Sequence, residues 1–356
     1  MRIFVDAHVL DGSPQGTTSY VAGLYRALAQ LNEAKLYIAT RSYQSVEKYF
    51  SGVQNIEWVA LKSENSLYRL GLELPKLEKS ISPNFSHYNY ICPSVKSSYW
   101  INTIHDILFL DQPKYFPLSY RAKRSFLFNI SARRADIIIT DSDYSRRTIT
   151  DRFGLPESKV YTIPIGVDSY STIKPVPVED IQSKKFLLYV SRFEPRKNQH
   201  QLIEEFEAVS EGMSLDVKLL LVGYPSVRYP KLEKIIKDKP PKLLILSGLS
   251  DGQLKWLYMN AIAAVYPSNG EGFGLPVIEA VAAGGISYCA ENTALNELKN
   301  YVHGTFNNDE VGDLTRVLSY LLSNDKKNHQ EKQSFVLRDF NWMKAAERFV
   351  SVLQDF

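Results

Sequence analysis

Short apolar runs alternate along this chain with longer stretches in which apolar residues recur at helical spacing. The short runs predict strands, which in the first half lie at 2–6, 35–39, 56–61, 98–104, 136–140 and 160–163. A second series of predicted strands lies at 186–191, 217–222, 243–246, 262–266 and 286–290. The stretches between them predict helices, among them 18–31, 118–134, 199–209, 251–260 and 276–283. Strands that alternate with helices indicate parallel βαβ units, so the sequence predicts an α/β fold.

The two series are separated by the segment 169–185, which reads SYSTIKPVPVEDIQSKK. Two prolines, several hydroxyls and charges without sustained periodicity predict an inter-domain linker. We therefore expect an N-terminal domain at 1–168 and a C-terminal domain at 186–339. The last segment, 340–356, carries apolar residues on one face of an amphipathic helix. The sequence predicts two doubly wound parallel-sheet domains facing each other across a cleft, with ligands beyond the carboxyl ends of the strands.

Composition and charge narrow the class of protein. Hydrophobic residues make up 44% and charged residues 23% of the 356 residues, which excludes a disordered chain, a collagen-like chain and a coiled-coil rod. The net charge of +3 is too small for bulk affinity to nucleic acid, so no nucleic-acid partner is expected.

The two cysteines and the apolar runs bear on the compartment. Cys92 and Cys289 cannot form a disulfide framework and are too few for a Cys-only zinc site, so we expect buried apolar side chains. No run is long enough for a membrane span, and the first residues lack the apolar core of a signal peptide. We expect a cytoplasmic protein whose membrane contact, if it has any, is peripheral.

A glycine-rich loop between a predicted strand and a predicted helix is the most informative segment. The segment 264–283 reads AVYPSNGEGFGLPVIEAVAA, with the strand ending at Tyr266. Pro276 is expected at the first helical position, where the missing N–H is harmless. The loop 272–275 would then present backbone N–H groups at a helix N-terminus, which favours binding of an anion such as a phosphate.

Two carboxylates, Glu271 and Glu279, bracket the start of this helix. Eight helical residues span about 12 Å, so the pair is too far apart for close acid/base work but suits the two ends of one long ligand. The competing interpretation is that both are solvent-facing, as most Glu residues are. Alternating glycines at 270, 272 and 274 suggest a dinucleotide fingerprint, but Leu275 and the lack of an acidic ribose reader exclude a dehydrogenase.

The segment 267–280, PSNGEGFGLPVIEA, resembles the E-x7-E motif of the retaining family 4 glycosyltransferases, which have the GT-B fold. This resemblance implies that Glu279 binds the ribose of a nucleotide-sugar and that Glu271 faces the transferred sugar. It also implies that backbone amides hold the sugar and its phosphates, at Gly272, Phe273, Gly274 and Leu275.

A second segment, 186–198, reads FLLYVSRFEPRKN and places three cations after an apolar strand. Fixed cations stabilise a diphosphate leaving group, although a charged loop is often simply solvated. The segment resembles the family's phosphate clamp, in which an Arg is followed five residues later by a Lys. Arg192 and Lys197 match these positions, whereas Arg196 does not and is expected to face solvent.

In the N-terminal half, His105 and Asp106 follow the predicted strand 98–104. A lone histidine is usually structural or exposed. The HD pair, however, resembles the family's acceptor-side histidine, which contacts the donor sugar beside the reacting carbon. Asp106 is expected to orient the loop.

Two further loops match the family by position. The loop 11–19, DGSPQGTTS, resembles the glycine loop that closes over the donor phosphates, and Gly16 best matches its glycine. The segment 246–249, LSGL, lies where the family reads the nucleobase through the backbone, so Leu249 is expected there.

The segment 140–143, TDSD, allows two interpretations. A D-x-D after a strand is typical of the metal site of GT-A glycosyltransferases, but Asp and Ser are also preferred helix caps. Capping is favoured because the rest of the chain resembles the GT-B pattern. We expect no metal ion and no other cofactor, since the nucleotide-sugar is a donor substrate.

The stretch 114–134 contains six cations and interleaved aromatic residues but no acidic residue. One interpretation is a helix with a solvated basic face. The other is a surface that docks on anionic lipid, suited to a lipid-linked acceptor. Single-stranded nucleic acid is disfavoured by the near-neutral whole.

The resemblance spans almost the entire chain and implies a retaining, metal-independent hexosyltransferase. The HD, RFEPRKN and EGFGLP motifs are most similar to those of bacterial polysaccharide and O-antigen mannosyltransferases. GDP-mannose is therefore the first donor expected, with UDP-hexoses and deoxysugar nucleotides as alternatives. The expected acceptor is a saccharide or polyprenyl-linked saccharide, met in the cytoplasm or on the inner face of the cell membrane. Two other classes stay open: a non-catalytic nucleotide-sugar-binding GT-B module, and a nucleotide-sugar epimerase of the same fold.

Overall fold

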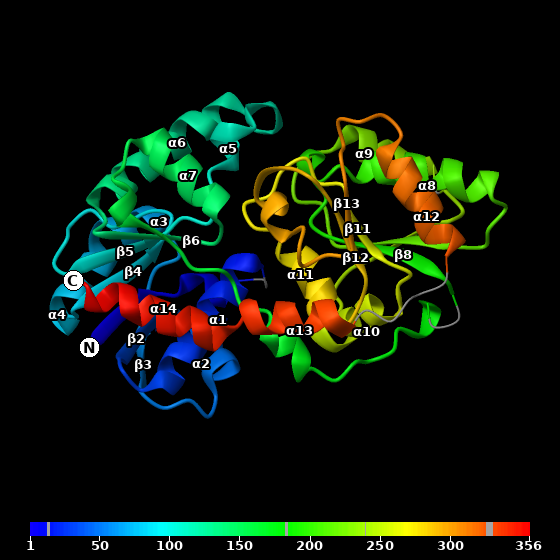
Figure 1. Cartoon of the computed structure of the whole chain (residues 1–356). Coiled ribbons are helices and arrows are strands. Elements are labelled where there is room, and N and C mark those ends of the chain that lie inside the picture. Colours follow the sequence, from blue (N-terminus) through cyan, green and yellow to red (C-terminus); the bar gives the residue numbers. More distant parts are fainter. Residues whose placement is uncertain (13–14, 182–183, 239, 325–329) are drawn as a thin grey trace. The chain divides into compact units, whose positions relative to one another are not determined.

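The chain folds into two compact units around two sheets. The computed structural model describes residues 1–12, 15–181, 184–238, 240–324 and 330–356. Unit 1 comprises Met1–Gly166 and Phe340–Phe356, and unit 2 comprises Val167–Asp339. Figure 1 labels most of their helices and strands. All recorded strand pairings within the two sheets are parallel, which confirms the predicted α/β class.

The sheet of unit 1 has seven strands in the order β3-β2-β1-β4-β5-β6-β7. Their bounds are β1 (Arg2–Asp6), β2 (Lys35–Thr40), β3 (Ile56–Ala60), β4 (Phe85–Asn89), β5 (Tyr99–Thr103), β6 (Ile137–Thr140) and β7 (Val160–Thr162). The sequence predicted all of these but β4. That strand reads FSHYN, so it has no apolar run, yet it is buried throughout because it lies between β1 and β5.

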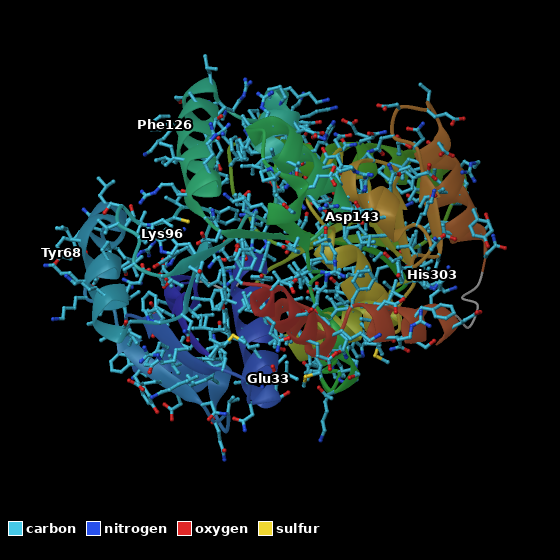
Figure 2. The ribbon with its side chains drawn as sticks, turned by 60° about the vertical axis from the view of Figure 1, so that its left-hand side comes forward. Glu33, Tyr68, Lys96, Phe126, Asp143 and His303 are labelled. Atoms are coloured by element: carbon cyan, nitrogen blue, oxygen red, sulfur yellow. The ribbon has the colours of Figure 1, made fainter. Side chains whose placement is uncertain are left out.

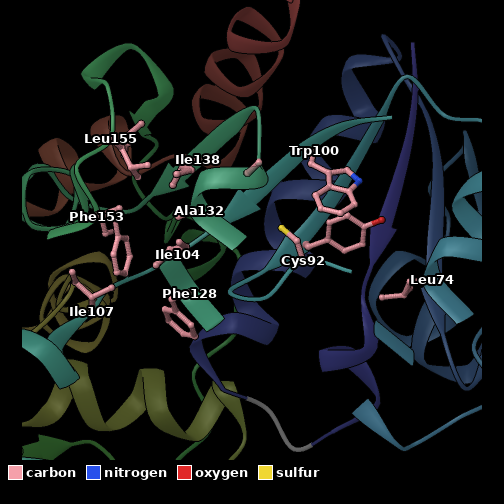
Figure 3. Packing of buried hydrophobic residues seen from close by; sticks show 14 of the residues in the cluster. Leu74, Cys92, Trp100, Ile104, Ile107, Phe128, Ala132, Ile138, Phe153 and Leu155 are labelled. Atoms are coloured by element: carbon pink, nitrogen blue, oxygen red, sulfur yellow. The ribbon is translucent and has the colours of Figure 1, made fainter. Parts of the chain in front are cut away.

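Helices cover both faces of this sheet. Their bounds are α1 (Gly16–Leu31), α2 (Tyr43–Phe50), α3 (Ser66–Tyr68), α4 (Leu74–Ile81), α5 (Leu108–Asp111), α6 (Leu118–Arg134), α7 (Asp143–Phe153) and α14 (Trp342–Gln354), with a π-helical turn η2 (Arg69–Glu73). On one face, Tyr25 of α1 and Phe349 of α14 pack on His87 of β4. On the other face, Trp100 and Phe128 belong to an apolar cluster that includes residues of α4, α6 and α7 (Figure 3).

The C-terminal helix α14 packs on α1 through Trp342, whose ring occupies the space beside two glycines, Gly23 and Gly166. A Cβ added to Gly23 of α1 would lie 2.1 Å from Cε2 of Trp342, and one added to Gly166 would lie 2.5 Å from Cγ of the same ring. Only glycine leaves room for the indole at these two positions. The C-terminal helix α14 thus belongs to unit 1 and packs on α1, which lies far from it along the chain.

The substitution Gly23→Ala tests this packing. Alanine normally stabilises a helix relative to glycine, but here its methyl group overlaps the indole, and overpacking typically costs about 1–3 kcal/mol. We expect the midpoint of thermal unfolding to fall by about 3–10 °C, measured by circular dichroism. Gly71→Ala is the matched control in the same unit, since a Cβ there meets nothing within 4 Å. An unchanged midpoint for Gly23→Ala would contradict this packing.

The sheet of unit 2 has six strands in the order β10-β9-β8-β11-β12-β13. Their bounds are β8 (Phe186–Val190), β9 (Lys218–Val222), β10 (Leu243–Leu246), β11 (Ala264–Tyr266), β12 (Ser287–Ala290) and β13 (Gly304–Phe306). The sequence predicted the first five. The sixth, GTF, is too short to show a period, and its pairing with β12 defines it.

Helices α8 and α12 pack together in unit 2, as do α11 and α13 (Figure 1). The bounds are α8 (Gln199–Gly212), α9 (Pro230–Asp238), α10 (Asp251–Asn260), α11 (Leu275–Ala282), α12 (Asp313–Ser323) and α13 (Gln330–Asp339), with 3-10 turns η5 (Asp168–Ser171), η6 (Glu179–Ile181) and η7 (Pro195–Lys197). The buried ammonium of Lys255 on α10 donates to the carbonyl oxygens of Tyr170 and Ile173, at 2.6 and 2.8 Å. The segment that joins the two series of strands is therefore tied to unit 2.

Two findings concern the cysteines and the membrane. Cys92 and Cys289 are both buried free thiols, as the sequence predicted. None of the helices in the described parts of the chain has the length and apolarity that a membrane crossing requires.

Candidate functional site

Two loops of unit 2 lie side by side because the strands that precede them are neighbours in the sheet. β8 leads into the loop that holds η7, and β11 leads into the glycine-rich loop 267–274. The backbone N–H of Asn269 donates to the carbonyl oxygen of Arg196 at 2.8 Å. The hydroxyl of Tyr189, on β8, donates to the carbonyl oxygen of Lys197 at 2.7 Å. The two segments singled out in the sequence thus form one structure at the carboxyl edge of the sheet.

A buried carboxylate, Glu271, holds two cations of the other loop. Its Oε1 lies 2.6 Å from Nζ of Lys197, and its Oε2 lies 3.0 Å from Nη1 of Arg196. Nη2 of Arg196 lies 2.5 Å from Oε1 of Glu194, and its Nη1 donates to the carbonyl oxygen of Gly270. Glu271, Lys197 and Arg196 are each less than a tenth exposed. We call these three side chains, with Glu194, the Glu271 cluster.

The electrostatics of the Glu271 cluster keep its carboxylate charged. Burial alone would raise the pKa of Glu271, but the neighbouring Lys197 and Arg196 outweigh it and lower that pKa to about 2. Burial lowers the pKa of Lys197, and Glu271 acts in the opposite direction on it. The contact at 2.6 Å is that of an ion pair, so the cluster fixes a positive ammonium at the edge of the sheet.

We expected Arg196 to face solvent, and that prediction is wrong. Its side chain is buried between the carboxylates of Glu194 and Glu271, because the tight η7 turn directs it back toward the glycine-rich loop. The exposed cation of this loop is Arg192. Two of the three cations are therefore held by carboxylates, while the third lies at the surface.

The helix after the glycine-rich loop begins one residue earlier than expected. Leu275 is its first residue and Pro276 its second, so the prediction of Pro276 at the first position is wrong by one. The N-cap is Gly274, with φ of +99° and no side-chain cap; a Cβ there would also lie 2.6 Å from Cδ2 of Leu295. Glycine is required at this N-cap, where no side chain caps the helix by a hydrogen bond from the N-cap position.

Glu279 lies on α11 in a different environment from Glu271. It is partly buried, and its Oε2 accepts a hydrogen bond from the hydroxyl of Tyr258 at 3.3 Å. Burial raises the pKa of Glu279 to about 7, against the lowering effect of that hydrogen bond. The two carboxylates of the motif thus differ in charge state near neutral pH, which the sequence could not show.

The remaining predicted residues of unit 2 also lie in loops or at helix starts. Gly272 and Phe273 are buried in the glycine-rich loop, next to the N-cap of α11. Leu249 is partly exposed after β10, the edge strand, and directly precedes the N-cap of α10. Leu249 therefore stands two strands away from β8 along the carboxyl edge.

In unit 1, His105 lies just past β5 and pairs with Asp141, which follows the neighbouring strand β6. Nδ1 of His105 lies 2.6 Å from Oδ2 of Asp141, and both residues are buried. The rings of Tyr20 and Tyr90 stand edge-on to the imidazole, with centroids 4.9 and 5.5 Å away. Nε2 of His105 is buried and has no hydrogen-bond partner among the residues that the structure describes. One ring nitrogen is thus fixed and the other can meet a ligand.

The charge of this histidine depends on its partner. Burial lowers the pKa of His105, but the charge of Asp141 and the hydrogen bond to it outweigh burial and raise that pKa above its usual value. The carboxyl oxygen of Asp106 accepts a hydrogen bond from the N–H of Leu108 at 3.0 Å, in agreement with the expected loop-orienting role.

The TDSD segment separates its two carboxylates. Ser142 is the N-cap of α7 and accepts a hydrogen bond from the N–H of Ser145, as the capping interpretation predicts. Asp143 accepts a hydrogen bond from the hydroxyl of Thr162 at 2.6 Å, whereas Asp141 pairs with His105. Nowhere in the described ranges do three or more His, Cys, Asp or Glu side chains form a group that could hold a metal ion.

Gly16 is the first residue of α1 and is exposed. The N-cap residue Gln15 makes no side-chain hydrogen bond to the helix. This 16-residue helix starts at the carboxyl edge of unit 1, and Tyr20 lies in its second turn. Part of the predicted loop, residues 13–14, lies outside the described residues.

Sequence reasoning missed two members of these constellations. Arg196 was set aside because it does not fit the clamp spacing, and Asp141 was considered only as part of the D-x-D segment. A signal existed for Asp141, since it directly follows a predicted strand, where side chains line a ligand site. No signal in the sequence indicated that Arg196 would turn toward Glu271.

Family models match the chain in two successive parts. The model described as Glycosyltransferase Family 4 matches residues 14–170, and the model described as Glycosyl transferases group 1 matches residues 174–334. Together they leave only the ends of the chain and a short junction unmatched.

Curated relatives are similar over part of their length. O-antigen chain mannosyltransferase B of Escherichia coli is 28% identical over 207 residues, which are 56% of this chain and 54% of the relative. O-antigen chain mannosyltransferase RfbU of Salmonella typhimurium is 30% identical over 184 residues, 51% of this chain and 49% of the relative. The matched part of the chain thus spans about half the length of these relatives.

Solved structures are similar over the whole chain. Sucrose-phosphate synthase from Thermosynechococcus elongatus superposes with a TM-score of 0.76 at 17% identity, covering 99% of this chain and 98% of that one. The Anabaena protein Alr3699/HepE in complex with UDP-glucose gives 0.74 at 14% identity, covering 100% and 99%. At such identities the likeness is one of fold.

Proposed function

This chain belongs to the family 4, group 1 glycosyltransferases with the GT-B fold, and on that premise we propose that it transfers a hexose from a nucleotide-sugar to a saccharide with retention of configuration. The observation that carries the proposal is the Glu271 cluster, which fixes a buried ammonium at the carboxyl edge of unit 2. A fixed cation is what a departing diphosphate requires. Arg192 and the start of α11 are further groups of unit 2 that suit phosphate oxygens.

The proposed step breaks the bond between the anomeric carbon and the phosphate oxygen, whose electron pair leaves with the nucleoside diphosphate. The acceptor hydroxyl oxygen bonds to the anomeric carbon on the same face, and its proton passes to the departing phosphate. Lys197 and Arg192 neutralise the charge that develops on that phosphate. Glu279 would bind the ribose, Leu249 would border the nucleobase, and His105 would contact the transferred sugar.

We assign mannose as the first candidate for the transferred sugar, with GDP-mannose as the donor. The support is that several curated relatives are named as mannosyltransferases, two of them for O-antigen chains. UDP-hexoses and deoxysugar nucleotides are the alternatives. A UDP-hexose is supported by the complex of Alr3699/HepE, a protein of similar fold, with UDP-glucose.

The test is release of nucleoside diphosphate from a panel of sugar nucleotides, each with and without a saccharide acceptor and with and without a chelator. We expect release from one donor, dependent on the acceptor and insensitive to the chelator. Activity lost on chelation and restored by manganese would contradict the metal-independent proposal. Binding without release would indicate a non-catalytic module, and conversion of the donor without an acceptor would indicate an epimerase.

The raised pKa of Glu279 predicts how nucleotide binding depends on pH. With a pKa of about 7, the carboxylate that accepts ribose hydroxyls forms mainly between pH 6 and pH 8. Since its ionised fraction rises about tenfold over that range, we expect affinity for the nucleoside diphosphate to rise by up to about tenfold. Isothermal titration calorimetry measures this rise, and Glu279→Gln is expected to remove it, leaving only the dependence of the nucleotide's own phosphate.

Glu279→Gln is expected to weaken nucleotide binding at high pH but to raise the stability of the fold there. A buried carboxyl whose pKa is raised stabilises the fold at low pH, and this contribution is lost as the pH rises through about 7. At pH 8 we therefore expect Glu279→Gln to unfold at a higher temperature than the wild type, and near pH 5 at about the same temperature. Equal unfolding temperatures at pH 8 would contradict the burial of a charged Glu279.

The proposed acceptor is a saccharide, free or polyprenyl-linked, and α6 supports contact with an anionic membrane at the inner face of the cell membrane. Leu118, Phe126 and Ile130 on this helix are 74%, 66% and 40% exposed, and Phe126 stands out from the surface in Figure 2. Exposed apolar side chains beside cations are typical of a helix that lies on anionic lipid. The basic stretch 114–134 is thus assigned as the membrane contact.

Flotation with vesicles tests this contact. We expect binding to vesicles that contain phosphatidylglycerol and none to pure phosphatidylcholine, because the attraction to lipid is mainly electrostatic. The double substitution Lys123→Glu with Phe126→Ala should reduce the bound fraction about tenfold. Lys231→Glu, on an exposed side chain of unit 2, is the control. Equal binding of all three proteins would exclude this surface.

A further inference from the structure

Asn89, the last residue of β4, carries a buried amide without a hydrogen-bond partner. The residue is 8% exposed, and neither Oδ1 nor Nδ2 has a partner within the described part of the chain. Buried side-chain amides are nearly always hydrogen-bonded, because an unpaired one destabilises the fold. An Asn in this position therefore needs an explanation beyond packing.

The neighbouring polar side chain on the same face of the sheet, His87, has both of its ring nitrogens hydrogen-bonded. His87, two residues earlier on β4, bonds the hydroxyl of Tyr25 through Nδ1, and its Nε2 lies 2.7 Å from Oγ1 of Thr103. That oxygen in turn lies 3.0 Å from the hydroxyl of Tyr20. Asn89 is the register partner of Thr103, and side chains two apart on a strand share a face. On this face of the sheet, both ring nitrogens of His87 are hydrogen-bonded, whereas the amide of Asn89 has no partner among the described residues.

Asn89 lies at the edge where His105 also has an unpaired atom. Tyr20 contacts both Thr103, the register partner of Asn89, and the ring of His105. Tyr90, the residue after Asn89, contacts the same imidazole from another side. The helix that supplies Tyr20 also starts here, and its N-cap residue, Gln15, makes no side-chain hydrogen bond to it. The amide of Asn89, at the end of β4, and Nε2 of His105, just past β5, thus both lack hydrogen-bond partners among the described residues at one edge of the sheet.

The backbone after Asn89 is held in a strained turn. Tyr90 has φ of +65°, a left-handed conformation that a residue with a Cβ adopts at a cost and that occurs preferentially at functional sites. Its N–H donates to the carbonyl oxygen of Thr103 at 2.8 Å, and its ring stacks on Phe128 at 5.3 Å. The surroundings therefore fix the turn that presents Asn89.

We propose that Asn89 binds hydroxyl groups of a hexose, next to Nε2 of His105. The amide offers two N–H donors and an acceptor oxygen, which match neighbouring hydroxyls that both donate and accept. Its uncharged amide suits a neutral polyol. This inference rests on the proposed function, and the hexose is either the transferred sugar or a sugar of the acceptor.

The experiment compares Asn89→Leu and Asn89→Ala with the wild type and with Asn84→Ala. Asn84 immediately precedes β4 at its other end and is exposed, so it is a matched control. Using the donor identified by the panel, we expect kcat/KM to fall about 10- to 100-fold in both Asn89 variants. Binding of the corresponding nucleoside diphosphate, which lacks the hexose, should be unchanged.

Two arms distinguish the source of the hexose. A rise in the dissociation constant of the sugar nucleotide, measured by calorimetry without acceptor, identifies the transferred sugar. An unchanged dissociation constant with a raised KM for the acceptor identifies the acceptor sugar. Wild-type kcat/KM in both Asn89 variants, or an equal loss of nucleoside diphosphate binding, overturns the proposal.

A stability measurement keeps the test independent of the proposed function. Leu has as many side-chain heavy atoms as Asn, branched at the same carbon, and no polar atoms, so Asn89→Leu is expected to raise the unfolding temperature by about 2–4 °C. A fall would mean that the amide makes structural hydrogen bonds and would overturn the proposal. Failure of the proposed function would appear separately, as no turnover of any donor by the wild type.

Discussion

Lys197→Met is expected to lower the transfer rate about 100- to 1,000-fold, as removal of a preorganised charge from a transition state usually does. Its ammonium is buried, fixed by Glu271 at 2.6 Å, and proposed to meet the departing diphosphate. Methionine keeps the length and apolar volume of the side chain and removes only the charge. The measurement is the initial rate of nucleoside diphosphate release at saturating donor.

The same substitution is expected to destabilise unit 2. Removing one partner of a buried ion pair leaves the other uncompensated and typically costs about 3–5 kcal/mol. Glu271 keeps Arg196 as a partner, so we expect the lower end of that range. The effect is measured as a lower midpoint of urea unfolding. The transfer rates are compared without denaturant, at a temperature at which the variant is folded.

A double variant separates chemistry from stability. Glu271→Gln combined with Lys197→Met removes both charges, so stability should recover in part while the transfer rate stays low. Lys231→Met removes an exposed cation of the same unit and is expected to change neither quantity. A double variant that is stable and as active as the wild type would disprove the proposed role of the Glu271 cluster.

Asp141→Asn is expected to reduce turnover about 10- to 100-fold, through His105 and without direct contact with the substrate. Asp141 accepts a hydrogen bond from Nδ1 at 2.6 Å, which orients the ring and holds its other nitrogen at Nε2 ready for a ligand. An asparagine of the same shape can keep the contact but not the charge. A loss of this size follows from the misdirected or wrongly protonated ring.

The pH dependence distinguishes orientation from a merely structural role. Asp141 outweighs burial and raises the pKa of His105, so without that charge burial should lower the pKa below its usual value. We expect the His105 titration, followed by NMR, to shift to lower pH in Asp141→Asn, together with the pH profile of kcat. The chain has only six histidines, so the ring signals can be assigned with a His105→Gln reference.

An unchanged His105 titration with reduced turnover would contradict this account, since the loss would then have another cause. Asp143→Asn is the control, because Asp143 bonds Thr162 and lies two residues away on the same segment. Its turnover and pH profile should match the wild type.

The sequence predicted the architecture well because the fold follows from local periodicity. Apolar runs and helical spacing located eleven of the thirteen strands, and order along the chain indicated parallel sheets. β4 and β13 were missed for different physical reasons. FSHYN has no apolar run and is buried by its place inside the sheet and by the helices packed on it, while GTF is too short to carry a period.

The candidate site was predicted by residue type and spacing, but not by pairing. Glu271 and Lys197 were identified on separate segments, and the adjacency of β8 and β11 brings them to 2.6 Å. Arg196 shows what motif spacing cannot predict. The sequence predicted that its side chain faces solvent, but the 3-10 turn η7 directs it toward Glu271.

By itself, the sequence determined the two α/β halves, the glycine-rich loop and the residues proposed to bind a nucleotide-sugar, because periodicity and motif spacing are local properties of the chain. The tertiary structure alone decided which carboxylate is charged, which aspartate orients His105, and that Asn89 is buried without a partner. Those properties depend on burial and on contacts between segments distant along the chain, and only the folded sheet brings such segments together.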